Sequence, residues 1–178
     1  LVRMDWNIND KHKLTGRYVY HDSEAQINIS NSQSAGFGNR TQNINAMSFQ
    51  NSGYTIMDNT RSAVLELNSK FSNTLHNNLI VSYDKQIEDR KYRSSLFPTI
   101  DILSGTSTYA SVGFDPFTPG NKLDYNTFHI TDNITKYAGK HTLTGGLNFE
   151  KYQSNNLFFP ASNGVYIFSS LTSFYAAA

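Results

Sequence analysis

Hydrophobic and polar residues alternate along several long stretches of the chain. The first stretch, residues 1–9, places its apolar side chains at every second position: Val2, Met4, Trp6 and Ile8. A period of two is the pattern of a β-strand whose two faces meet different environments. Turn-forming residues follow at 9–12, and the alternation resumes up to residue 21. Two alternating runs joined by a short polar turn predict a β-hairpin.

The same unit recurs twice further along the chain. Hairpins are predicted at residues 1–21, 60–88 and 125–153. Long polar connections rich in Ser, Asn, Gly and Pro separate and follow them, at 22–59, 89–124 and 154–165. Further strand structure is expected within 45–56, and Ser169 or Ser170 is expected to cap a short helical turn over 171–177. The pattern predicts an all-β fold, an antiparallel meander of about six long strands.

Strand length separates a membrane barrel from a soluble sheet. The alternating runs reach ten to thirteen residues, whereas soluble strands average ~5–6 and a tilted membrane-crossing strand needs ~9–11. Short turns at one end and long loops at the other are typical of outer-membrane β-barrels. Six strands are too few to close such a barrel, since single-chain barrels begin at about eight. We therefore expect residues 1–178 to be a partial transmembrane barrel domain, an internal segment of a longer chain in the bacterial outer membrane.

The strand alternation assigns charged and amide side chains to the face opposite the apolar one. In a barrel of this kind the polar face lines the lumen. The residues expected there are Glu66, Lys70, Asp84, Asn148 and Glu150. Asp132 breaks the pattern, because it shares its face with Phe128 and Ile134. A bulge near 131–133, or a different register, is the expected explanation.

Composition excludes several classes of function. The net charge is +1 with no basic stripe, so nucleic acid is not an expected partner. The absence of cysteine excludes disulfides and thiol chemistry. None of the five histidines forms a His-x-His or His-x3-His pair, and no Gly-x-Ser-x-Gly elbow is present. Pairs such as Asp22 with Glu24 resemble solvated loop carboxylates more than a calcium site. We expect no enzyme activity, no metal and no cofactor.

Aromatic residues in the predicted external loops are the best candidates for contact with a ligand. Aromatic rings give a large contact area and have few rotatable bonds to immobilise. These residues are Phe37, Tyr109, Phe114, Phe117, Phe158 and Phe159. The alternative is that they pack the loops against one another.

Three stretches of sequence together resemble a known family. They are Asn51–Thr55 with Asn59–Ser69, then Leu96–Leu103, and finally Phe128–Thr135 with Gly139–Gly146, Asn156–Phe158 and Tyr166–Leu171. They resemble TonB-dependent receptors of the Bacteroidetes outer membrane, and most closely the Oar-like group, which carries a carboxypeptidase-regulatory-like domain. The resemblance implies a barrel of about 22 strands with a plugged lumen. It also implies ligand uptake powered by the TonB complex, with the plug and the TonB-contacting segment outside these residues.

Two other functions compete with an active-transport receptor. A passive porin-like barrel would have no plug upstream of this segment. A soluble all-β adhesion or carbohydrate-binding module would stay soluble without detergent. Because open strand edges and an apolar face promote aggregation, we predict that the isolated segment aggregates without detergent. Outer-membrane lipid and an unidentified transported ligand are the expected partners in the first case.

Overall fold

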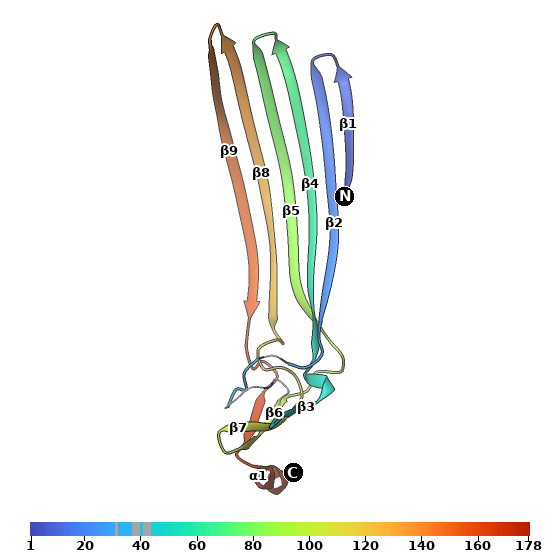
Figure 1. Cartoon of the computed structure of the whole chain (residues 1–178), viewed down its shortest axis with the longest axis vertical. Helices are drawn as coiled ribbons and strands as arrows, with labels where there is room; N and C mark the ends of the chain where they lie inside the picture. The colour runs from blue at the N-terminus through green and yellow to red at the C-terminus, as the bar shows by residue number, and fades with distance from the viewer. Residues whose placement is uncertain (31, 37–39, 41–43) are drawn as a thin grey trace. The chain divides into compact units, whose positions relative to one another are not determined.

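Six long strands form the larger of two sheets in the computed structural model, which describes residues 1–30, 32–36, 40 and 44–178. They are β1 (Val2–Asn9), β2 (His12–Ile27), β4 (Tyr54–Ser72), β5 (Leu75–Tyr92), β8 (Asn121–Ala138) and β9 (His141–Phe158). Their order in the sheet is β1-β2-β4-β5-β8-β9, so each long strand lies beside the next long strand of the chain (Figure 1). The predicted all-β antiparallel meander of six strands is confirmed.

Local chemistry explains the tight turns of this sheet. In the first hairpin, Asn9 Oδ1 accepts hydrogen bonds from the backbone N–H groups of Lys11 (2.8 Å) and His12 (3.0 Å). This is the local bonding that makes asparagine a turn residue. The register of β1 and β2 shifts between Asn7 and Asn9, next to the turn. The last hairpin turns at Gly139, whose φ of 62° lies in the left-handed region that favours glycine.

A second, smaller sheet is built from the two long connections between the hairpins and from the segment that follows β9. It contains β3 (Met47–Ser48), β6 (Thr99–Ser104), β7 (Ser107–Val112) and β10 (Val165–Phe168), in the order β10-β6-β7-β3. β6 and β7 form an antiparallel hairpin, while β10 pairs parallel to β6 and β3 pairs parallel to β7. Segments from both long connections and from the chain after β9 therefore share one hydrogen-bonded sheet.

The chain divides into two units by its internal contacts. The first unit comprises 1–22, 59–87 and 124–155, and the second comprises 23–58, 88–123 and 156–178. The long strands extend beyond the hairpin limits expected from sequence: β4 begins at Tyr54, β5 ends at Tyr92 and β9 ends at Phe158. Polar residues stand on both faces at these ends, so the alternation that identifies a strand fades before the strand does.

Helix and turn elements complete the second unit. A 3-10 turn, η1, covers Gln50–Ser52, and the helix α1 covers Leu171–Ala177. Ser170 caps α1 as predicted, with its side chain accepting from Ser173 N at 3.1 Å, while Ser173 Oγ accepts from Ser170 N at 3.0 Å. Among the described residues, no helix has the length and apolar content to cross a membrane.

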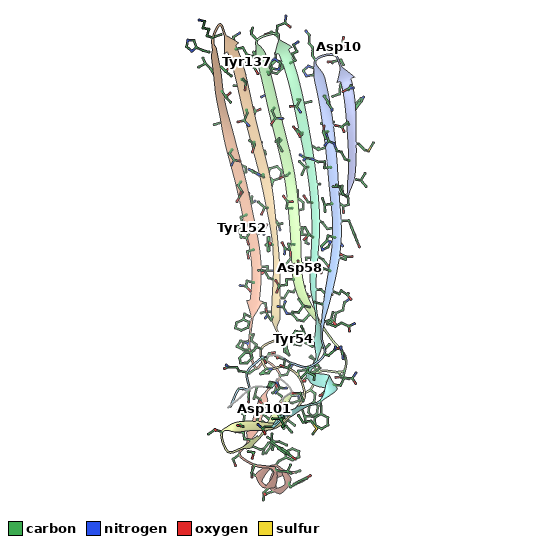
Figure 2. The ribbon with its side chains drawn as sticks, viewed as in Figure 1. Asp10, Tyr54, Asp58, Asp101, Tyr137 and Tyr152 are labelled. Carbon is green, nitrogen blue, oxygen red and sulfur yellow. The ribbon has the colours of Figure 1, made fainter. Side chains whose placement is uncertain are left out.

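A buried ion pair occupies the centre of the second unit. Arg40 and Asp101 are both 0% exposed, and Arg40 Nη1 donates to Asp101 Oδ1. Asp101 lies on β6, within the small sheet (Figure 2). Its carboxylate also accepts from Ser34 Oγ (2.5 Å) and Ser111 Oγ (2.7 Å). Residues from the first and second connections thus meet at one carboxylate.

The guanidinium of Arg40 is incompletely satisfied. Among the described residues, Nη2 makes only long contacts, with the carbonyl oxygens of Phe114 (3.3 Å) and Gly113 (3.4 Å), and Nε has no hydrogen-bond partner there. Burial lowers the pKa of this guanidinium, and the nearby carboxylates of Asp101 and Asp115 oppose that shift. Asp101 is therefore the partner that makes burial of the charge tolerable.

We predict that Arg40→Met weakens the second unit selectively. Removing one partner of a buried pair leaves an uncompensated charge, at a cost of about 3–5 kcal/mol. Hydrogen exchange of the β6 and β7 amides in the full-length protein measures this as lost protection.

Lys122→Met is the matched control, because Lys122 pairs with Asp89 at 3.2 Å with both side chains partly exposed. Such a pair contributes about 0–1 kcal/mol. Equal protection in the two variants would contradict a central role for Arg40. If Arg40→Met fails to fold, Asp101→Asn removes the charge and keeps the size of the side chain.

Candidate functional site

One face of the larger sheet, here called the polar face, carries a hydrogen-bonded network within the first unit. At its β1–β2 end, Asp5 accepts from Arg3 Nε (2.9 Å) and Thr15 Oγ1 (2.8 Å), and Lys13 Nζ lies 3.2 Å from the same carboxylate. Asp5 pairs directly with Thr15 in the strand register, so these side chains point to the same side. One carboxylate thus joins two cations and a hydroxyl.

Glu66 is the centre of the network between β4 and its neighbours. Its carboxylate accepts from Asn68 Nδ2 (3.1 Å), Asn78 Nδ2 (3.0 Å) and, at 3.4 Å, Arg17 Nη2. Asn78 also donates to Asn68 Oδ1 at 2.9 Å. Side chains of β2, β4 and β5 therefore meet at one residue of the polar face.

The network continues onto β8 and β9. His129 Nε2 and Asn148 Oδ1 lie 2.5 Å apart, and Thr131 Oγ1 donates to the same Asn148 oxygen at 3.3 Å. Tyr125 donates to Gln86 of β5 and packs its ring 5.7 Å from that of Tyr152. Tyr152 lies well inside β9 rather than at its end (Figure 2).

The five residues expected on the lumen side share this face. Glu66 and Asn148 are members of the network. Asp84 and Glu150 follow by strand alternation from Asn78 and Asn148. Lys70 contributes to a hollow of about 520 Å³ at the turn end of the first unit, together with Lys11, Lys13 and several asparagines. These residues present charged and amide groups, and their arrangement suits contact with water or a polar partner.

The opposite face, here called the apolar face, carries Leu65, Tyr83 and Leu147 in exposed positions. Asp132 stays on this face, contrary to the bulge or register change expected from the sequence. The contacts of Tyr125, His129, Thr131 and Thr135 on the polar face keep one alternation along β8. The carboxylate is accommodated because Asn77 Nδ2 donates to Asp132 Oδ1 at 2.5 Å and to the Asn133 carbonyl at 3.0 Å.

Three of the loop aromatics come together on paired segments of the second unit. Phe159 N donates to Gly120 O at 2.9 Å and Ala161 N donates to Pro116 O at 2.6 Å, which joins the segment containing Phe117 to the one containing Phe158 and Phe159. All three of these rings are exposed. A ligand can reach each of these rings.

The other loop aromatics are placed differently. Tyr109 is exposed on β7, which is not one of the two paired segments that carry Phe117, Phe158 and Phe159. Phe114 is 2% exposed and packs edge-on against Tyr92, with ring centroids 5.1 Å apart. Burial raises the pKa of the Tyr92 hydroxyl to about 12. Phe114 therefore packs inside the unit, while Phe37 lies outside the described residues.

Sequence reasoning missed the Arg40–Asp101 pair. A signal was present: Arg40 is the only charged residue between Glu24 and Asp58, and Asp101 is the only one between Arg93 and Asp115. A single charged residue in a long uncharged stretch has no oppositely charged neighbour in the sequence, so its ion-pair partner has to come from another stretch. Among the described residues, no group of three or more His, Asp or Glu side chains is placed to hold a metal ion.

Comparison with protein families supports this geometry, while the two comparisons with individual proteins give no match. No curated protein and no solved structure matches the chain. A family model described as "Outer membrane beta barrel domain" matches residues 1–177. The alternating faces, the long strands and this match over nearly the whole length lead to one conclusion: the chain belongs to the outer membrane β-barrel domain family and is an outer-membrane protein.

Proposed function

We propose that the chain forms part of the barrel of a TonB-dependent receptor that takes up a ligand across the outer membrane. In this proposal the polar face lines the lumen and contacts water or a plug domain supplied by another part of the same protein. The exposed loop aromatics make the first contact with the ligand. The role is transport, with no catalytic step.

The single observation that carries the proposal is the folding of both long connections and the segment after β9 into one sheet. Segments of 23–58, 88–123 and 156–178 share this hydrogen-bonded sheet, and a buried ion pair joins the first two of them. A ligand surface built on an ordered scaffold loses less conformational entropy on binding than one built on free loops. The sequence resemblance to Oar-like receptors supports the same function.

A passive porin-like barrel is the second candidate, and the polar face favours it as much as it favours a receptor. Charged side chains such as Glu66 and Lys70 suit a water-filled channel lining. Membership of the outer-membrane family leaves no support for the soluble adhesion or carbohydrate-binding module.

We predict that the full-length protein shows no steady ion conductance in a planar lipid bilayer. A plug fills the lumen of a receptor at rest, whereas a porin conducts without any energy source. Deleting the plug in the frame of the same protein is expected to open a large, stable conductance. A steady open current from the intact protein would favour the porin.

We also predict that the full-length protein binds the purified periplasmic domain of TonB. Energised uptake requires this contact, and a porin lacks it. Surface plasmon resonance with the protein in detergent micelles measures the binding, with an unrelated porin as the control. Signals equal to those of the control porin would count against active uptake.

Glu66→Ala tests whether the polar network stabilises the barrel wall. The substitution removes the shared acceptor of Arg17, Asn68 and Asn78, which are at most partly buried, so it is expected to cost about 0.5–1.5 kcal/mol. Urea unfolding of the full-length protein in lipid vesicles is expected to show a lower midpoint.

The control is Glu150→Ala on the same face, since Glu150 is exposed and none of the hydrogen bonds or ion pairs described above involves it. Its midpoint should stay within error of the wild type. Equal shifts for both variants would show that charge alone, and not the network, sets the effect.

A further inference from the structure

Charged side chains are nearly absent from three stretches that include most of the second unit. The stretches are residues 25–57, 94–121 and 152–178. They contain three charged residues, Arg40, Asp101 and Asp115, and no histidine, whereas about 25% of the residues of a typical domain are charged. All three charged side chains are buried, at 0%, 0% and 2% exposed. The side chains that the described residues of these stretches expose are therefore uncharged.

A run of apolar residues lies in the last of these stretches. Leu157, Phe158, Phe159, Pro160 and Ala161 are consecutive in the chain, and all five are exposed. The three largest of their side chains are exposed by 54%, 58% and 63%. Several exposed apolar residues in a row are disfavoured on a protein surface unless they contact a partner. These five residues are here called the apolar run.

Backbone hydrogen bonds fix the apolar run to the segment that carries Phe117. Phe159 N donates to Gly120 O at 2.9 Å, and Ala161 N donates to Pro116 O at 2.6 Å. Phe117 lies between these two acceptors in the chain, and its ring is exposed. An exposed aromatic residue and the apolar run are thus held on two paired backbone segments.

The buried carboxylate of Asp115 holds the segment of Phe117 in place. It accepts from Phe117 N at 2.8 Å and from Thr118 Oγ1 at 3.0 Å. The carbonyl oxygen of Thr118 accepts in turn from the Tyr92 hydroxyl at 2.9 Å. A site that is ordered in this way before a ligand arrives loses less conformational entropy on binding.

Lipid does not cover the apolar run, because the run lies too far along β9. At ~3.4 Å per residue, about 54 Å of strand separates His141, beside the tight turn, from Leu157. With the tilt of ~35–45° found in membrane barrels, this length gives a height of about 40 Å, whereas the apolar band is about 25 Å tall. The polar residues 153–156 also separate the run from the apolar positions of β9.

Uncharged polar side chains border the apolar run at both ends in the sequence. Ser154, Asn155 and Asn156 precede it, and Ser162 and Asn163 follow it. Interfaces that bind polypeptides have this composition: aromatic and apolar residues with few charges at the centre, and a rim of polar groups around them.

We propose that the apolar run and Phe117 bind an uncharged, apolar peptide segment of the ligand. The inference names the ligand class of the proposed receptor and rests on that proposed function for the transport of the ligand. Apolar side chains of the peptide pack on the exposed rings, and its backbone amides meet the serine and asparagine side chains of the rim. A charged segment would lose its hydration here and find no opposite charge to replace it.

An oligosaccharide matches the apolar run less well than a peptide does. A sugar carries a hydroxyl group on most of its carbon atoms, and each hydroxyl needs a hydrogen-bond partner once water is excluded. The five side chains of the apolar run offer neither a donor nor an acceptor. Apolar peptide side chains need none.

Retention of peptides by the full-length protein in detergent micelles tests the proposal. The probes are three mixtures of hexapeptides whose ends are acetylated and amidated, so that the termini carry no charge. The four central residues are drawn from leucine, phenylalanine and valine. The two outer residues are serine in the first mixture, lysine in the second and glutamate in the third. Retained peptides are measured by mass spectrometry after rapid filtration, with protein-free micelles as the blank and maltohexaose as a fourth probe.

Phe159→Ser removes one ring of the site, and Tyr109→Ser is the matched control. The Tyr109 ring is also exposed, but it lies on β7, outside the two paired segments. The wild type is expected to retain the serine mixture about tenfold more than the lysine or glutamate mixture. Phe159→Ser should lower this retention about tenfold, which corresponds to the loss of one buried aromatic contact, and Tyr109→Ser should leave it unchanged.

Two further variants keep the test decisive. Phe158→Ser replaces Phe159→Ser if the latter fails to fold. Leu157→Lys places a cation in the apolar run and is expected to shift the preference toward the glutamate mixture, because the new charge gives a carboxylate a partner.

Three outcomes would overturn the proposal. They are no retention of any peptide, equal retention of the three mixtures, and equal retention by the wild type and Phe159→Ser. Retention of maltohexaose that Phe159→Ser abolishes, without retention of peptides, would identify a sugar as the ligand instead.

This test and the tests of active uptake fail independently. A protein that binds the TonB domain and retains no peptide would reject the ligand class and leave active uptake standing. A protein that retains the uncharged peptides and conducts freely would do the reverse.

Discussion

A single layer of strands has to satisfy its backbone through neighbouring strands and still present two chemically different faces. Backbone N–H and C=O groups cannot remain unpaired in a bilayer, which is why only closed barrels and helices cross one. In this chain the constraint appears as six strands in simple meander order. Side chains then divide strictly by alternation, with Glu66 on one face and Leu65 on the other. The polar network and the apolar face are both consequences of that division.

The second unit obeys a different constraint, because its segments come from connections that are far apart in the sequence. Many of its buried residues are polar: Ser30, Thr99, Ser111 and Asp115 are all nearly inaccessible. Such groups must be hydrogen-bonded to be tolerated. Asp115, for example, accepts from Ser32 Oγ, Phe117 N and Thr118 Oγ1. Buried polar bonding gives this unit its order, and the rings of Phe117 and Phe159 are presented on it.

These two kinds of order suit different parts of a transport protein. A wall of alternating strands separates lipid from a polar interior and tolerates variation on the polar side. In the proposed receptor, an ordered surface built from loops would hold the ligand-contacting rings in place, as binding sites on loops require a rigid scaffold. The family match establishes the outer-membrane barrel, and the ordered connections support the receptor proposed above.

The sequence by itself determined the fold class, the hairpins, the tight turns and the two faces, because strand alternation and turn chemistry are local properties of the chain. The helix cap at Ser170 was equally readable for that reason. Only the tertiary structure decided the rest. The structure shows the Arg40–Asp101 ion pair, the burial of Phe114 and the hydrogen bond from Asn77 to Asp132. Each of these depends on contacts between residues that are distant along the chain. Partners of this kind are selected by register and packing between strands, and no local pattern encodes that choice.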